Sequence, residues 1–61
     1  MRQWLIDARK KKGMSQADMA KAIHVSAPSY WAYESGAARP KPDNAKKIAS
    51  VLGFPWTKFY E

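Results

Sequence analysis

The sequence predicts an all-α fold, a compact arrangement of five helices, and three observations support it. Glycine occurs only 3 times and β-branched residues are few, whereas helix-favouring Ala, Lys, Met, Leu and Gln recur. Apolar residues fall at helical spacing, and serines and glycines stand where helices would begin and end. Hydrophobic residues make up 46% of the 61 residues, which is enough for one core, so we expect a single domain over residues 1–61.

The first predicted helix covers residues 1–12. Its apolar positions lie at helical spacing: Met1, Trp4, Leu5 and Ala8. Basic residues fill its last turn and Gly13 follows, which is typical of a helix that ends in a left-handed residue.

Two shorter helices follow, each with its own start signal. Ser15 and Asp18 match the capping box, in which a serine caps the helix and an acid three residues later returns the hydrogen bond. Ser26 is expected to cap the third helix, with Pro28 in its first turn and Gly36 as its end.

A loop over residues 37–42, marked by two prolines, separates the third helix from a fourth. We expect Asp43 to cap this fourth helix and Gly53 to end it. The inward positions of the fourth helix are Ala45, Ile48, Ala49 and Leu52. A short final turn or helix over residues 55–60 completes the five, and the core is closed by Phe54, Trp56 and Phe59.

Composition excludes several classes of protein. The chain has no cysteine and 1 histidine, which excludes a disulfide scaffold and a zinc site. No apolar stretch approaches the ~20 residues that span a bilayer, and the start does not resemble a signal peptide, so we expect a soluble, cytoplasmic protein. Paired acids, a nucleophile–base set and a phosphate-binding glycine loop are missing, so we expect no enzymatic activity, no cofactor and no small-molecule substrate. We expect no effector domain after Glu61.

The charge points instead to a polyanion. The chain has 11 Lys+Arg against 5 Asp+Glu, a formal net charge of +6. The basic residues do not line one face against a continuous apolar stripe, which argues against a membrane-surface helix. Two short helices around a tight turn over residues 16–35, in a basic protein, favour a helix-turn-helix that binds double-stranded DNA.

The order and spacing of residues across most of the chain resemble the Cro/phage-repressor (Xre-type) helix-turn-helix family. The positions that carry the resemblance include Arg9, Gly13, Met14, Ser15, Gln16, Met19, Ala20, Ile23, Val25, Ser26, Tyr33, Glu34, Ser35, Gly36, Pro42, Ala49, Leu52 and Gly53. The segment from Asn44 to Phe59 is similar to immunity-type repressors of bacterial mobile elements. The resemblance implies a lambda-repressor-like domain that occupies a palindromic operator as a homodimer, with contacts either from the C-terminal segment or formed only on DNA.

The resemblance also implies roles for particular residues. Gln16 would bond a phosphate, with Ser15 and the amides of the helix start nearby. Arg9 and Glu34 would form an internal ion pair that ties the first helix to the third. His24 stands where the family has a left-handed glycine, a conformation that histidine tolerates at some cost.

The third helix has two distinct faces. Tyr30, Tyr33 and Glu34 share one side by helical spacing, and the aromatic rings make it the core side. The opposite side holds Ala27, Pro28, Trp31, Ala32 and Ser35.

Base readout is expected from the outer side of this helix. The resemblance implies that bases are read from the positions of Ala27, Pro28 and Ala32, but here these side chains lack hydrogen-bonding groups. Readout would then depend on thymine methyls, on the hydroxyls of Ser26 and Ser29, and on DNA shape.

The nearest cations and Trp31 complete the predicted site. Arg39 and Lys41 in the loop are expected to contact phosphates, whereas residues 10–12 either contact DNA or only solubilise the chain. Trp31 could pack on a loop, contact the groove or bind a protein. The leading hypothesis is therefore a small sequence-specific repressor-type regulator associated with the nucleoid; the alternative is a protein-interaction module, an antirepressor or adaptor, that uses the Trp31 face.

Overall fold

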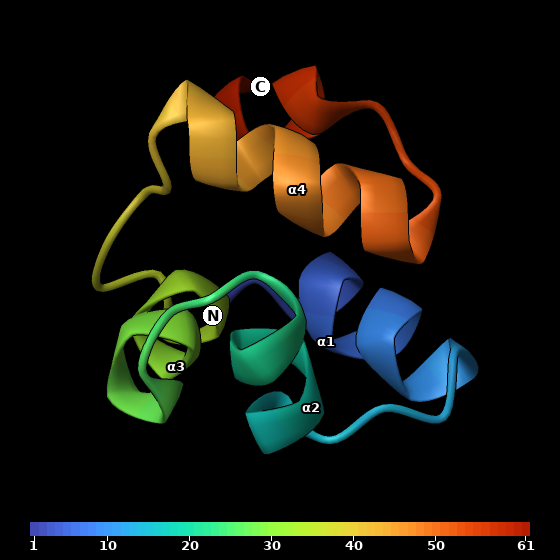
Figure 1. Cartoon of the computed structure of the whole chain (residues 1–61). Helices are drawn as coiled ribbons and strands as arrows, with labels where there is room; N and C mark the ends of the chain where they lie inside the picture. The colour runs from blue at the N-terminus through green and yellow to red at the C-terminus, as the bar shows by residue number, and fades with distance from the viewer.

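The computed structural model describes residues 1–61 as four α-helices and a final 3₁₀ helix, with no strands. The helices are α1 (Gln3–Lys11), α2 (Gln16–Ala22), α3 (Ala27–Ser35), α4 (Pro42–Leu52) and η1 (Trp56–Tyr60). Helix α4 and η1 pack together on one side of the molecule, and α2 packs against α3 on the other, with α1 touching α3 (Figure 1). No helix combines the length and the apolar character that crossing a membrane requires.

The predicted start signals of α2 and α3 are confirmed. The Ser15 hydroxyl accepts a hydrogen bond from the Asp18 amide at 3.0 Å, and the Asp18 carboxylate accepts one from the Ser15 amide at 2.9 Å, which completes the capping box. Ser26 caps α3 by accepting the Ser29 amide at 3.2 Å, and Pro28 lies in the first turn. These bonds satisfy amides that have no partner within a helix.

Two predicted boundaries are wrong. Helix α4 begins at Pro42 with Lys41 as its N-cap, so Asp43 is a first-turn residue and not the cap. Proline suits the first helical position because its φ is fixed and its missing N–H is not needed there. Helix α1 begins at Gln3, and Met1 is 81% exposed instead of lying on the core face. The amide of Arg2 donates to the Glu34 carbonyl at 2.7 Å, which holds the preceding chain against α3 instead of in a helix.

The count of five α-helices is not confirmed, because the last element is a 3₁₀ helix of 5 residues. Pro55 precedes it and supplies no N–H, and so short a segment closes few of the longer α-helical bonds. The predicted aromatic contribution to the core is nevertheless present. Phe59 is buried, and its ring meets Trp4 at 5.1 Å and Phe54 at 5.6 Å between centroids, both edge to face.

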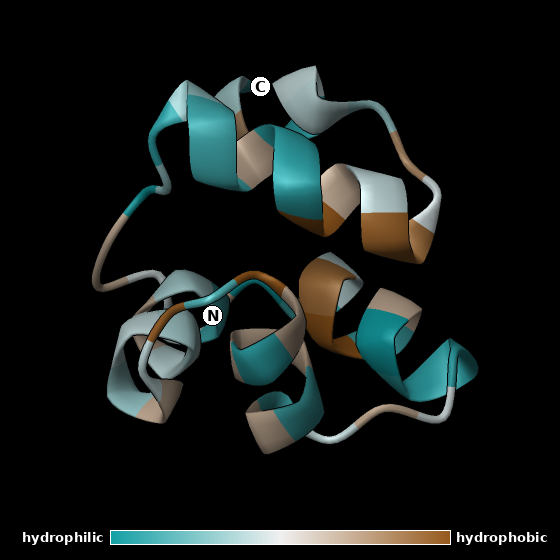
Figure 2. Ribbon diagram, in the orientation of Figure 1, coloured by the Kyte–Doolittle hydropathy of each residue, from teal (hydrophilic) through white to brown (hydrophobic).

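The core lies between the two sides of the molecule. Its buried members are Leu5, Met19, Ala20, Ile23, Tyr30, Ala45, Ile48, Leu52 and Phe59. Figure 2 shows the hydrophobic stretches of α1 and the end of α4 turned toward this centre, with hydrophilic residues on the outer side of α4. The four predicted inward residues of α4 are all buried.

A buried ion pair joins α1 to α3. The Arg9 Nε atom lies 2.6 Å from Glu34 Oε2, and its Nη2 atom lies 3.3 Å from Oε1. Arg9 also donates to the Met14 carbonyl at 2.8 Å, and Gln16 Nε2 donates to Glu34 Oε1 at 3.0 Å. The Glu34 carboxylate therefore receives bonds from the start of α2 as well as from α1.

Formation of the pair shifts the pKa values of Arg9 and Glu34. Burial alone would raise the pKa of Glu34, but hydrogen bonds from Arg9 and Gln16 bring this pKa below its ordinary value. The hydrogen bond to Glu34 raises the pKa of Arg9. Burial raises the pKa of Tyr30, whose hydroxyl lies beside the pair without a well-formed hydrogen bond.

The turn between α2 and α3 contains a left-handed histidine, as expected. His24 has φ 61° and is the only residue other than glycine with a positive φ. This conformation brings Cβ close to the backbone and is unfavourable for residues with side chains. The turn is thus tight at the expense of local strain.

Breaking the ion pair should unfold the domain or nearly so. Arg9→Met leaves the Glu34 charge buried without its cation, which costs roughly 3–5 kcal/mol, whereas replacing both residues with apolar ones costs far less. Lys10→Met, an exposed neighbour in α1, is the matched control. Urea denaturation followed by circular dichroism measures the free energies of unfolding. Equal midpoints for Arg9→Met and Lys10→Met would contradict the role given to the pair.

Acid should destabilise the wild-type protein partly through Glu34. Because its folded pKa lies below the ordinary 4.5, its contribution is complete above that pH and is lost as the pH falls through the folded pKa. The pKa of exposed Asp18 is also lowered, by hydrogen bonds from Ser15, and Asp18 contributes in the same direction. The free energy of unfolding, measured between pH 6 and pH 2, should fall less steeply with acid in Arg9→Met/Glu34→Leu than in the wild type. Asp18→Asn should remove the part of the acid dependence that Asp18 contributes. An unchanged slope in the double variant would contradict the assignment.

Replacing His24 with glycine should stabilise the protein. Glycine adopts the left-handed conformation freely, and the relief of strain exceeds its extra entropy in the unfolded chain by about 0.5–1 kcal/mol. In a domain of this size that is roughly 4 °C in melting temperature. His24→Val should melt lower than the wild type, because a β-branched residue fits this conformation worst. A His24→Gly protein that melts at or below the wild-type temperature would refute the strain argument.

Candidate nucleic-acid interface

Helices α2 and α3 and the turn over residues 23–26 form one packed unit. The inner face of α3 carries Tyr30 and Glu34, which are 0% and 1% exposed, and the rings of Tyr30 and Tyr33 meet edge to face at 6.4 Å. The Glu34 ion pair and the buried ring together set the rotation of α3 about its axis. The opposite face of α3 is therefore the one turned to solvent.

The outer face of α3 is exposed over its first turn and apolar. Ala27 and Pro28 are exposed, Trp31 is 49% exposed and Ala32 is half-buried. No charged side chain lies on this face, since the one charged residue of α3 is the buried Glu34. The rest of the chain leaves about half of the Trp31 surface accessible to a ligand.

The serine hydroxyls of this region already form some hydrogen bonds within the chain. Ser26 Oγ accepts the Ser29 amide and donates to Ser29 Oγ at 2.8 Å. Ser35 Oγ donates to the Ala32 carbonyl at 3.2 Å. Of the two serine hydroxyls on α3, that of Ser29 does not donate its proton within the chain, whereas that of Ser35 does.

The polar groups at the start of α2 are also bonded within the chain, by the capping box. The amide and the hydroxyl of Ser15 both bond Asp18, whose carboxylate lies exposed at the same helix end. Gln16 is half-buried and donates one amide hydrogen to Glu34, which leaves its second hydrogen and its carbonyl oxygen for another partner. Of these two predicted phosphate contacts, Gln16 retains more unused bonding capacity.

The predicted cations lie just after α3. Arg39 is exposed and its guanidinium lies 5.5 Å from the centre of the Tyr60 ring. Lys41 is exposed at the N-cap of α4. Both belong to the connection that follows α3 in the chain, which therefore carries the positive charge that α3 itself lacks.

Arg2 and Tyr60 hold this connection in place, a role that the sequence did not predict for either residue. Arg2 Nη1 donates to the carbonyls of Tyr33 at 2.6 Å and Ala38 at 2.7 Å. Burial, and then the nearby Arg39, lower the pKa of Arg2. The Tyr60 hydroxyl donates to the Pro40 carbonyl at 2.7 Å. These partners lie at least 20 residues apart in sequence, and no local pattern signals such contacts.

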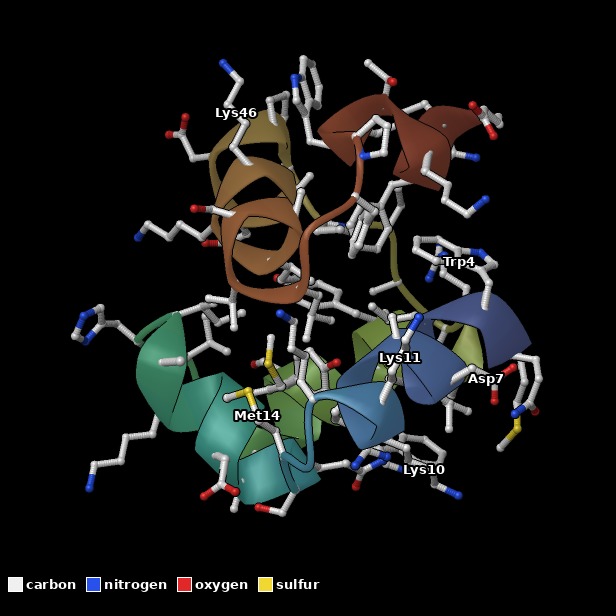
Figure 3. The ribbon with its side chains drawn as sticks, turned by 90° about the vertical axis from the view of Figure 1, so that its right-hand side faces the viewer. Trp4, Asp7, Lys10, Lys11, Met14 and Lys46 are labelled. Carbon is white, nitrogen blue, oxygen red and sulfur yellow. The ribbon has the colours of Figure 1, made fainter.

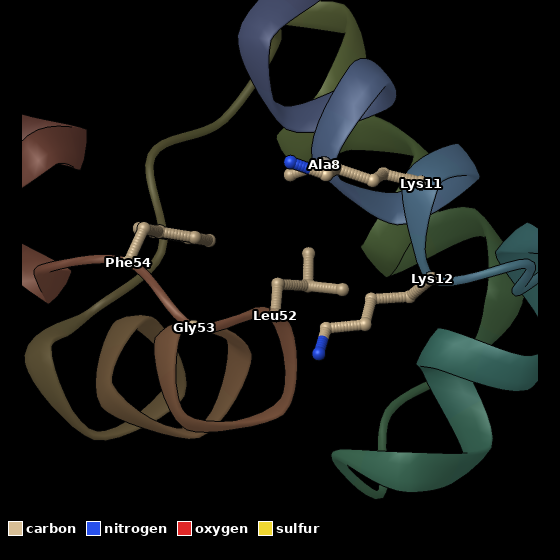
Figure 4. A pocket seen from close by; sticks show the side chains of 6 residues that line it. All are labelled: Ala8, Lys11, Lys12, Leu52, Gly53 and Phe54. Carbon is tan, nitrogen blue, oxygen red and sulfur yellow. The ribbon is translucent and has the colours of Figure 1, made fainter.

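Lys11 at the end of α1 and Lys12 directly after it lie along a separate hollow. It is lined by Ala8, Lys11, Lys12, Leu52, Gly53 and Phe54, between the ends of α1 and α4 (Figure 4). Figure 4 shows the Lys11 and Lys12 side chains extended along this hollow, and Figure 3 shows Lys11 on the side of α1 that faces α4. Their stems line this hollow together with Ala8, Leu52 and Phe54, at the end of α1 that Figure 1 shows on the opposite side of the molecule from α3.

Comparisons with known proteins agree with this geometry. A helix-turn-helix family model matches residues 5–59. The chain is 41% identical over 61 residues to the uncharacterized HTH-type transcriptional regulator YqaF of Bacillus subtilis (strain 168), covering 100% of this chain and 80% of that protein. It is 35% identical over 49 residues to the cryptic phage CTXphi transcriptional repressor RstR of Vibrio cholerae, covering 80% of this chain and 44% of RstR.

No solved structure matches the chain significantly. The family model nevertheless spans α1 to η1, and it includes the α2–turn–α3 unit whose outer face is exposed. On this evidence the chain belongs to the Xre-type helix-turn-helix family.

Proposed function

We propose that this chain binds double-stranded DNA sequence-specifically as a small repressor-type transcriptional regulator, with α3 in the major groove. The observation that carries the proposal is the free outer face at the start of α3, where Ala27 and Pro28 are exposed. A major groove is about 12 Å wide and admits one α-helix. Such a protein acts by occupying DNA and needs no catalytic group.

The charges around α3 support the same docking. Glu34, the one acid of α3, is neutralised by Arg9 and faces inward, so it does not repel phosphates. Arg39 and Lys41 supply exposed cations in the connection that follows α3, and Gln16 keeps free bonding capacity at the start of α2. We expect each subunit to neutralise about four to six phosphates, which gives log K a salt slope of about −4 to −5.

The regulatory role and the assembly are inferred from the relatives and from general geometry. RstR is named a transcriptional repressor of a cryptic phage and YqaF a transcriptional regulator, which favours repression in this chain. Helix-turn-helix proteins that bind as pairs contact half-sites one helical turn apart, so we expect a palindromic operator bound by two subunits. Half-buried Trp56 and exposed Tyr60 in η1 provide apolar surface for subunit contact.

Removing Arg39 should weaken binding to all duplexes alike. Arg39→Gln deletes a phosphate contact that carries no base information, so the salt slope should become shallower by about 1 while the preferred sequence stays the same. Fluorescence anisotropy with a duplex selected from a random pool, at several salt concentrations, measures the slope.

Lys46→Gln is the matched control for Arg39→Gln. Lys46 lies over the Trp56 ring at 5.1 Å, just as Arg39 lies over Tyr60, but Figure 3 places it at the end of the molecule away from α2 and α3. Its removal should leave the slope unchanged. If Arg39→Gln keeps the wild-type slope, Arg39 does not contact phosphate. If no duplex binds at all, DNA binding itself is wrong and a protein partner of the Trp31 face becomes the better hypothesis.

A further inference from the structure

The outer face of α3 offers almost no hydrogen bonds to bases. The side chains of Ala27, Pro28 and Ala32 have only carbon atoms, and that of Trp31 has a single indole N–H. Neither an amide nor a guanidinium stands on this face, so the bidentate recognition of guanine or adenine has no donor or acceptor set here.

The nearby hydroxyls add little to this. Ser26 Oγ accepts one hydrogen bond and donates another within the cap of α3, so its proton and one of its acceptor positions are already used. Ser29 Oγ accepts the bond from Ser26 and keeps its own proton. One hydroxyl donor from Ser29 cannot by itself distinguish the base pairs, because guanine, adenine and thymine all present acceptors in the major groove.

An apolar surface in a major groove has one matching feature on the bases. The C5 methyl of thymine is the only apolar group that a base edge presents there. Burying it against carbon atoms is favourable, whereas a G·C pair has no apolar group to offset the donors and acceptors that the same carbon atoms would leave without partners. The apolar face therefore favours base pairs whose thymine methyl it can bury.

We propose that α3 reads thymine methyl groups, with Ala27, Pro28 and Trp31 as the residues that determine specificity. The proposal rests on the DNA-binding function proposed above. Ala27 and Pro28 lie in the first turn of α3, and residues at the start of a recognition helix are those that meet base edges. Trp31 lies four residues after Ala27 on the same face, roughly 6 Å away, which is about the rise of two base pairs.

The test removes the methyl groups from the DNA without touching the protein. A duplex is selected from a random pool that contains thymine, and the same duplex is then made with uracil at each half-site thymine in turn and at all of them together. Each methyl in contact should contribute about fourfold to affinity, the factor equivalent to about 0.8 kcal/mol per buried methyl-sized group. With two contacted methyls per half-site, full replacement should weaken binding by more than tenfold per subunit. An unrelated duplex with the same replacement controls for general effects of uracil.

Protein variants then assign the methyls to side chains. Pro28→Ala and Trp31→Ala remove exposed groups and should fold normally, as circular dichroism will show. In each, the ratio of the dissociation constants for uracil and thymine duplexes should approach 1 at the base pair that the lost side chain contacts. Ser50→Ala, an exposed change on α4, should keep the wild-type ratio.

Failure of this proposal differs from failure of DNA binding. If the selected duplex binds equally well with uracil, methyl reading is wrong although DNA binding stands. If the wild-type ratio persists in both Pro28→Ala and Trp31→Ala, the assignment to these side chains is wrong, since other atoms would then contact the methyls. If selection enriches no duplex, the DNA-binding function itself is wrong.

Discussion

The Arg9–Glu34 pair is the contact on which the rest of this small domain depends. A carboxylate that is almost completely buried must be neutralised, and Arg9 does so while Gln16 from α2 bonds the same oxygen atom. Helices α1, α2 and α3 are thus joined at one point. Because Tyr30 is buried on the same side of α3, the helix cannot rotate without exposing the ring and breaking the pair. The pair thereby decides which residues of α3 reach solvent.

The division of charge around α3 separates two contributions to binding. The cations that could contact a backbone lie after the helix, at Arg39 and Lys41, and the helix itself presents carbon atoms. Phosphate contacts provide affinity without sequence information, and base edges provide discrimination. In this chain the two tasks fall on different segments. The connection that holds the cations is fixed in turn by Arg2 and Tyr60, which bond its carbonyl groups from the two ends of the described chain.

Local signals explain most of what could be predicted. The capping box at Ser15 and the cap at Ser26 each depend on neighbours within a few residues, so the sequence pattern contains the whole interaction. The left-handed conformation at His24 is implied by the family resemblance instead. Asp43 was misplaced because Pro42 suits the first helical position better than a loop. The last helix was overestimated, since apolar spacing in a five-residue segment does not distinguish an α-helix from a 3₁₀ helix.

By itself the sequence determined the all-α class, the family resemblance and the two faces of α3, because each follows from helical periodicity or from short motifs. Only the tertiary structure decided that Gln16 bonds Glu34, that Arg2 and Tyr60 hold the α3–α4 connection, and that Trp31 stays half exposed. These outcomes depend on side chains that meet across many residues of chain. Such distances are set by how whole helices pack, and a local pattern of residue types does not contain them.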